Sequence, residues 1–168
     1  MELKDIKLLV VDVDGVLTDG RIFCSDSGEE QKVFHVRDGS GITYWHRAGL
    51  KSAIISGRTS RAVEHRAREL GISDVYQGAQ QKLDVYEKII EKHGLRDEEV
   101  CYVGDDLIDL PVLRRVGFSV AVPDSPEEVL SAVDYVTKAP GGGGAVREVV
   151  EKVLKSQGKW EGIMKRYV

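Results

Sequence analysis

The chain has 168 residues, of which 42% are hydrophobic and 31% are charged, a composition typical of one globular domain and not of a disordered or collagen-like chain. Its 24 Lys and Arg residues against 28 Asp and Glu residues give a net charge of −4, which disfavours binding to nucleic acid or to an anionic membrane. We expect neither a membrane span nor a signal peptide, and therefore a cytoplasmic protein in which Cys24 and Cys101 are free thiols.

Short runs rich in β-branched residues alternate with amphipathic segments along the chain. Strands are predicted at residues 6–13, 52–55, 75–77, 100–103, 118–122 and 135–136. Helices are predicted at residues 42–48, 61–70, 82–93, 106–116 and 146–155, several of them ending before a glycine. This alternation predicts an α/β fold with a doubly wound parallel sheet, in a single domain over residues 1–168.

Two segments interrupt the alternation. Residues 20–36 predict a β-hairpin flap inserted after the first strand, around a turn at residues 25–28. Near the other end, four glycines at residues 141–144 predict a flexible linker before the last helix and a tail at residues 160–168. Because the hairpin follows the end of the first strand, we expect it to lie beside any site built there.

Ligands of a parallel α/β sheet bind beyond the carboxyl ends of the strands, where this sequence places a notable set of polar residues. They are Asp12, Asp14, Ser56, Arg58, Lys82, Asp105, Asp106 and Asp109. Carboxylates that converge in one crevice repel each other unless a cation neutralises them, and oxygen ligands favour Mg²⁺. A hydroxyl and an ammonium group beside that cation suit a phosphoryl group, which an aspartate can attack.

The same residues fall into four motifs in a fixed order. The segments DVDGVLTDG (12–20), SGR (56–58), Lys82 and GDDLID (104–109) resemble the four motifs of the haloacid dehalogenase superfamily. The further segments GEE (28–30), VRDG (36–39), VYQG (75–78) and GAVRE (144–148) resemble a branch of that superfamily that has no cap domain and dephosphorylates eight-carbon sugar acid phosphates. The resemblance implies an Mg²⁺-dependent phosphomonoesterase of lipopolysaccharide precursor synthesis.

The resemblance also implies a role for each matching residue. Asp12 would be the nucleophile and Asp14 the general acid and base, and Mg²⁺ would be held by Asp12, Asp105 and the carbonyl of Asp14. The phosphate would be held by Ser56, Gly57 and Lys82, with Asp106 and Asp109 orienting Lys82 and metal-bound water. The sugar acid would contact His35, Val36, Arg37, Asp38, Gly39, Arg58 and Arg66, while Thr43 stands where some members carry a basic residue.

Other interpretations of these residues stay open. A phosphatase for a nine-carbon ulosonic acid phosphate would share the core and differ in its pocket contacts. A phosphorylation-dependent receiver module also combines carboxylates, a hydroxyl and a lysine on such a sheet, but its phospho-accepting aspartate would follow a middle strand. Taken singly, carboxylates at strand ends often cap helices, and arginines are usually solvated.

The short gaps between the motifs leave no room for a cap, so another element has to exclude water from the pocket. By resemblance we expect a homo-oligomer, a tetramer, in which the hairpin packs against neighbouring subunits and the tail reaches an adjacent active site. The expected partners are therefore a phosphorylated sugar acid and further copies of the chain, with no nucleic acid and no membrane.

Overall fold

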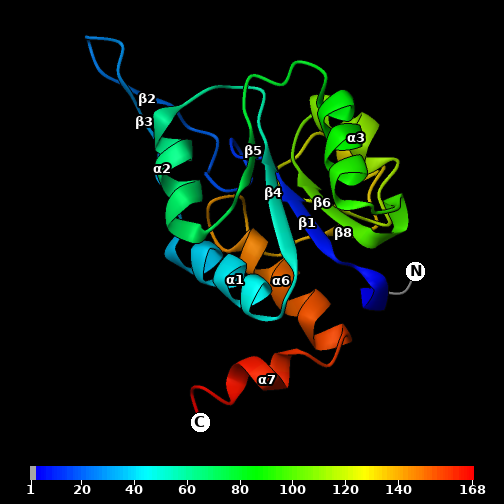
Figure 1. Cartoon of the computed structure of the whole chain (residues 1–168). Helices are drawn as coiled ribbons and strands as arrows, with labels where there is room; N and C mark the ends of the chain where they lie inside the picture. The colour runs from blue at the N-terminus through cyan, green and yellow to red at the C-terminus, as the bar shows by residue number, and fades with distance from the viewer. Residues whose placement is uncertain (1–2) are drawn as a thin grey trace.

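The computed structural model describes residues 3–168, and its centre is a six-stranded sheet in which every strand pair is parallel (Figure 1). The strands are β1 (Leu8–Val11), β4 (Lys51–Ile55), β5 (Asp74–Tyr76), β6 (Val100–Gly104), β7 (Phe118–Ala121) and β8 (Tyr135–Val136). Their order in space is β5-β4-β1-β6-β7-β8, so the chain builds outward on one side of β1 and then returns to add β6 on the other.

Helices cover both faces of this sheet. The helices on one face are α1 (Val36–Arg47), α2 (Arg61–Leu70), α6 (Ala145–Ser156) and α7 (Trp160–Met164), and those on the other are α3 (Lys82–His93), α4 (Leu110–Leu113) and α5 (Glu127–Leu130). Side chains of β1 alternate between the two apolar clusters: Leu9 and Val11 join the first, and Leu8 and Val10 join the second. The predicted α/β fold with a doubly wound parallel sheet is confirmed.

The strand order changes direction at β1, whose two neighbours are β4 and β6. In open parallel sheets, ligands bind in the crevice at the carboxyl ends of the strands beside such a change. The loops that follow β1, β4 and β6 therefore meet at one edge of the sheet, and these loops carry three of the four motifs. Between residues 3 and 168, no helix combines the length and the apolar character that a membrane span requires.

α1 begins at Val36 and not at residue 42, so the predicted start was wrong. The Asp-Gly-Ser sequence before residue 42 resembles a helix cap, but the cap is His35, whose Nδ1 accepts a hydrogen bond from Arg37 N at 3.2 Å. Glycine inside the helix permits a close contact, because a Cβ at Gly39 would lie 2.3 Å from the guanidinium of Arg66. Tertiary packing here outweighs the low helix propensity of glycine.

The predicted helix at residues 106–116 was also wrong as a single element. A 3₁₀ turn (Leu107–Asp109) precedes α4, because Pro111 has no N–H to donate and therefore favours the first turn of a new helix. α5 was not predicted, since four residues are too few to show a helical period. The predicted helices at residues 61–70, 82–93 and 146–155 match α2, α3 and α6 closely.

The predicted hairpin consists of two short antiparallel strands, β2 (Phe23–Cys24) and β3 (Glu30–Gln31). It stands away from the sheet, at the upper left of Figure 1. Its predicted extent was too long, because strand pairing ends at Gln31 and Val36 already belongs to α1.

The glycine tract at residues 141–144 is a packed turn, so the predicted flexible linker was wrong. Gly142 N donates a hydrogen bond to Val16 O at 2.9 Å. A Cβ at Gly141 would lie 1.7 Å from Gly15 O, an approach that only glycine permits. The tract therefore braces the loop that carries the first motif.

Candidate active site

Asp12 and Asp14 lie in the turn that directly follows β1. The side chain of Asp12 is buried, and its Oδ1 accepts a hydrogen bond from Val13 N at 2.7 Å. Gly15 adopts φ +91°, and a Cβ there would lie 1.9 Å from Asp105 Oδ2. Glycine at this position therefore permits both the turn and the approach of Asp105 to the loop after β1.

Lys82, the first residue of α3, joins two of the carboxylates. Its Nζ lies 2.9 Å from Asp12 Oδ2 and 2.7 Å from Asp109 Oδ1, and its side chain is 1% exposed. Burial lowers the pKa of Lys82, but the adjacent carboxylates of Asp12 and Asp109 outweigh burial and raise that pKa above its usual value. Lys82 therefore keeps its positive charge beside Asp12 at physiological pH.

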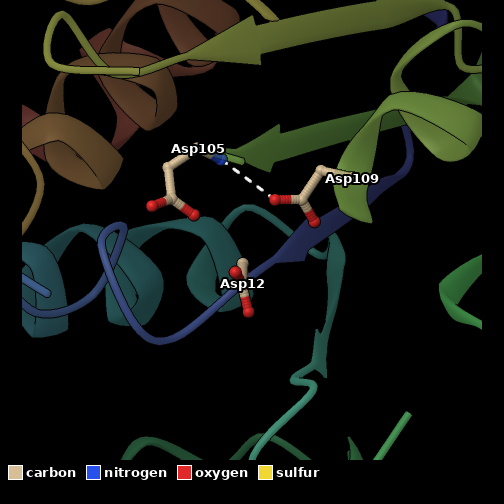
Figure 2. Close-up of side chains that lie close together, drawn as sticks. All are labelled: Asp12, Asp105 and Asp109. Atoms are coloured by element: carbon tan, nitrogen blue, oxygen red, sulfur yellow. Dashed lines mark hydrogen bonds between the residues drawn. The ribbon is translucent and has the colours of Figure 1, made fainter. Parts of the chain in front are cut away.

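The carboxylate of Asp109 is occupied by bonds within the protein. Its Oδ1 accepts hydrogen bonds from Lys82 Nζ at 2.7 Å and from Tyr102 OH at 2.6 Å. Its Oδ2 accepts hydrogen bonds from Asp105 N at 3.0 Å, drawn dashed in Figure 2, and from Asp106 N at 3.2 Å. These four bonds orient Lys82 and the loop after β6, and they leave Asp109 little capacity to bind a cation.

The carboxylates of Asp12, Asp105 and Asp109 each place an oxygen within 4.8 Å of the others (Figure 2). Asp105 Oδ1 is buried and has no hydrogen-bond partner between residues 3 and 168. Burial and the charges of Asp12 and Asp109 raise the pKa of Asp105 to about 8, and burial and Asp109 raise the pKa of Asp12 to about 6. An oxygen-only ligand set with an unpaired buried carboxylate oxygen fits a hard divalent cation such as Mg²⁺.

Replacing Asp105 with Asn is expected to stabilise the metal-free protein near pH 8. A carboxyl with a raised pKa in the folded state costs stability as the pH rises from its unfolded value toward about 8, because the fold disfavours its charge. The variant avoids this cost and should gain about 1 to 3 kcal/mol in the free energy of unfolding. In EDTA near pH 8 its melting temperature should therefore exceed that of the wild-type protein, and the difference should disappear toward acidic pH.

Magnesium titration provides the control for this variant. Mg²⁺ should raise the melting temperature of the wild-type protein and leave that of Asp105→Asn nearly unchanged. The reason is that Mg²⁺ stabilises only a folded protein that binds it, and the variant lacks the coordinating carboxylate of Asp105. A melting temperature of the variant below that of the wild-type protein, in EDTA near pH 8, would contradict the inference that repulsion between the carboxylates destabilises the metal-free protein.

A pocket of about 290 Å³ opens where the loops after β1, β4 and β6 meet. Its lining residues are Asp12, Asp14, Ser56, Gly57, Arg58, Gln80, Lys82, Asp105, Asp106 and Ile108. Ser56 is buried, and its Oγ accepts a hydrogen bond from Arg58 N at 3.4 Å. The structure thus brings together the residues predicted for nucleophilic attack, proton transfer, metal binding and phosphate binding, with Asp109 directly behind them.

Three residues at this site were not predicted. Gln80 and Ile108 line the pocket, and Lys32 forms an ion pair with Asp14. Gln80 lies two positions before the motif residue Lys82, and Ile108 lies inside the segment GDDLID, so both positions carried a signal in the sequence. A lysine just after a hairpin strand has no sequence feature that separates it from an ordinary surface lysine.

His35 and Asp38, two of the residues predicted to contact a sugar acid, cap helices in this structure. The carboxylate of Asp38 is buried and accepts hydrogen bonds from Gly144 N at 3.2 Å and from Arg147 N at 2.9 Å, at the start of α6. Burial raises the pKa of Asp38, although these backbone bonds act in the opposite direction. Asp38 therefore links α1 to α6.

The other predicted sugar contacts divide between two places. Arg58 lines the pocket and pairs with Glu30 of the hairpin at 2.5 Å. Arg66 lies in a separate open hollow of about 570 Å³, where it pairs with Glu69 at 2.8 Å. Outside the pocket, Val36 also lines that hollow, Arg37 is exposed, and Gly39 packs on Arg66.

Comparison with known proteins shows similarity over nearly the whole chain. A family model described as haloacid dehalogenase-like hydrolase matches residues 29–117. The 3-deoxy-D-manno-octulosonate 8-phosphate phosphatase of Escherichia coli is 49% identical over 156 residues, which cover 93% of this chain and 83% of that protein.

Solved structures of similar proteins have the same fold. The phosphatase of the same name from Moraxella catarrhalis, in complex with magnesium ion, phosphate ion and a KDO molecule, has a TM-score of 0.97 and 41% identity, and covers 99% of this chain and 96% of its own. The one from Yersinia pestis has a TM-score of 0.94 and 46% identity, and the match covers 96% of this chain and 87% of the Yersinia chain.

Proposed function

Since this chain belongs to the haloacid dehalogenase-like hydrolase family, we propose that it is an Mg²⁺-dependent phosphatase that hydrolyses 3-deoxy-D-manno-octulosonate 8-phosphate to the free sugar acid and phosphate. The observation that carries the proposal is the convergence of Asp12, Asp14, Ser56, Lys82 and Asp105 on one pocket. The similarity to phosphatases of that name supports the substrate. We place the reaction in the cytoplasm, in the synthesis of lipopolysaccharide precursors.

Two displacements at phosphorus account for the hydrolysis. In the first, a carboxylate oxygen of Asp12 attacks phosphorus, the bond to the sugar oxygen breaks, and Asp14 gives its proton to that oxygen. In the second, water attacks the phosphorus of the aspartyl phosphate, Asp14 takes a proton from the water, and the bond to Asp12 breaks. Lys82 neutralises negative charge beside Asp12 in both steps, and Ser56 donates a hydrogen bond to the phosphoryl group.

Asp12, Asp105 and the backbone carbonyl of Asp14 are the groups that would hold Mg²⁺. When bound, the cation neutralises the carboxylates and the phosphoryl oxygens. Asp109 fixes the position of Asp105 through the hydrogen bond from Asp105 N, and Asp106 stabilises the next turn by accepting a hydrogen bond from Leu107 N at 2.7 Å.

Arg58 is the side chain in the pocket that suits the carboxylate of a sugar acid. Its guanidinium is half exposed at the pocket, and the planar fork of an arginine matches the two oxygens of a carboxylate. We assign the remaining sugar contacts to the segment from His35 to Gly39 and to Arg66. Of these residues, Val36 and Arg66 line the separate hollow, and within one chain the carboxylate of Asp38 is already engaged at the start of α6.

A panel of phosphate esters tests this function. Phosphate release should be fastest from the eight-carbon sugar acid phosphate, should stop in EDTA and should return with excess Mg²⁺. Faster release from a nine-carbon ulosonic acid phosphate would make that ester the substrate and leave the proposed reaction, phosphate ester hydrolysis, unchanged. A protein that is phosphorylated and stays so for minutes without turnover would be a receiver module, and the proposed phosphatase would be wrong.

We further propose a homo-oligomer, a tetramer, in which the hairpin packs on neighbouring subunits and the tail at residues 160–168 covers the pocket of a neighbour. Between the first two motifs the chain holds the hairpin, α1 and β4. Exposed apolar side chains gather on and beside the hairpin, and a neighbour would bury them: Ile22, Phe23, Val33 and Val36. α7 lies at the bottom of Figure 1, far from the hairpin, and packs on α1 through Trp160 and Tyr44.

The oligomer is expected to give a multiple of the monomer mass in light scattering. Deleting residues 160–168 should lower kcat/KM and leave the requirement for Mg²⁺ intact, because the tail excludes water and supplies no metal ligand. A fully active monomer would rule out an active site shared between subunits.

A further inference from the structure

Lys32 is a buried lysine that enters the pocket region from the hairpin. It follows β3, and its side chain is only 3% exposed. Its Nζ forms an ion pair and a hydrogen bond with Oδ1 of Asp14, in the loop after β1. Because a buried ammonium group is costly unless its charge is paired, this contact ties the hairpin firmly to Asp14.

The two carboxylate oxygens of Asp14 have different environments. Oδ1 bonds to Lys32, whereas Oδ2 is buried and has no hydrogen-bond partner in the part of the chain that the structure describes. Asp14 also lines the pocket. A buried acceptor is rarely left unpaired in a native structure, so Oδ2 is the oxygen of Asp14 that keeps unused capacity to accept a hydrogen bond.

The hairpin holds a second pocket residue in a comparable way. Glu30, two residues before Lys32, accepts a hydrogen bond from Arg58 Nη2 at 2.5 Å. The side chain of Arg58 is 50% exposed, so this ion pair is weaker than that of the buried Lys32. The hairpin is therefore attached to the loop after β1 and to the loop after β4, and the stronger attachment is at Asp14.

We propose that Lys32 is a positioning residue that holds Oδ1 of Asp14 and thereby directs Oδ2 toward the leaving oxygen and the attacking water. A carboxylate with one oxygen held cannot turn freely about its Cβ–Cγ bond, so its other oxygen keeps a fixed direction. Lys32 itself exchanges no proton and touches no reacting atom. This inference rests on the proposed phosphatase activity and adds to it a residue outside the four motifs.

Esters with different leaving groups test the proposal on the purified full-length protein. The esters are 3-deoxy-D-manno-octulosonate 8-phosphate, phenyl phosphate and 4-nitrophenyl phosphate, whose leaving groups need a proton strongly, moderately and hardly at all. In Lys32→Met, kcat/KM should fall about 10- to 100-fold for the sugar ester, less for phenyl phosphate and less than about threefold for 4-nitrophenyl phosphate. kcat/KM is the appropriate quantity because it reports the step in which the leaving group departs.

Two matched variants separate positioning from a general effect on the hairpin. Lys32→Arg keeps the charge and should recover most of the lost activity toward the sugar ester. Arg21→Met removes another hairpin cation, an exposed one that pairs with Asp19, and should keep wild-type values for all three esters. Thermal melting with and without Mg²⁺ establishes that each variant is folded.

An equal loss for all three esters, or no loss for any, would overturn the proposal. A large rise in the inhibition constant of inorganic phosphate in Lys32→Met would also overturn it, because Lys32 would then bind the phosphoryl group. Failure of the proposed function gives a different result, which is seen in the wild-type protein. If the wild-type protein hydrolyses none of the esters, the phosphatase activity and the role of Lys32 are both wrong. If only the sugar ester is rejected, the two aryl esters still decide the role of Lys32.

Discussion

Replacing Asp12 with Asn should lower the turnover number for phosphate ester hydrolysis by about four orders of magnitude or more. An amide is a poor nucleophile and a weaker metal ligand than a carboxylate. The fold should survive, because Asp109 still pairs with Lys82 at 2.7 Å. Loss of a buried carboxyl whose pKa is raised to about 6 also relieves repulsion inside the site.

Steady-state rates and circular dichroism of this variant check the expectation. Asp5→Asn, which changes an exposed carboxylate outside the pocket, is the matched control and should have wild-type activity. If Asp12→Asn kept substantial Mg²⁺-dependent activity, Asp12 would not be the nucleophile.

Replacing Asp14 with Asn has the second largest expected effect, a loss of about 10²- to 10⁴-fold in turnover. Asparagine can neither protonate the leaving sugar oxygen nor take a proton from water. The backbone carbonyl proposed as a metal ligand is retained, so Mg²⁺ should still raise the melting temperature. Lys32 loses its carboxylate partner in this variant, and some loss of stability is expected from the buried unpaired charge.

The leaving group again provides the diagnostic comparison. Asp14→Asn should form the phosphoenzyme from 4-nitrophenyl phosphate, whose leaving group needs no proton, and should then hydrolyse it slowly. Rapid kinetics would show a burst of 4-nitrophenol followed by a slow phase. Ordinary steady-state turnover of the sugar ester would remove Asp14 from the mechanism.

The main sheet could be predicted from sequence because its strands are buried on both faces. Burial of this kind produces continuous apolar runs, such as Leu8–Val11 in β1. The site residues could be placed for a related reason, since parallel strands bring all their carboxyl ends to one edge. The order of the motifs along the chain therefore predicted that Asp12, Ser56 and Asp105 line the same pocket.

Features that depend on packing between distant segments could not be predicted from local sequence. Asp38 looks like a local cap, but its partners are Gly144 and Arg147 at the start of α6. The glycine tract looks flexible, but it packs on Gly15 and its neighbours. Each contact joins residues more than 100 positions apart in the sequence, a separation that no local pattern records.

The role of Lys32 escaped prediction for the same reason. Its neighbours in sequence predict only a hairpin, and the strands of that hairpin are two residues each. The ion pair between Lys32 and Asp14 can be recognised only in the folded structure, where the hairpin lies beside the loop after β1. Hydrophobic periodicity could not reveal this contact, because it locates buried faces and not individual ion pairs.

Phosphoryl transfer through Asp12 requires a covalent phosphoryl adduct on that residue, and trapping this adduct is the decisive measurement. Asp14→Asn is mixed with 4-nitrophenyl phosphate and Mg²⁺, quenched in acid and measured by mass spectrometry of the intact chain and of its peptides. We expect a mass gain of one phosphoryl group, located at Asp12, that is absent from Asp12→Asn/Asp14→Asn. Release of 4-nitrophenol without an adduct, or an adduct at another residue, would contradict it.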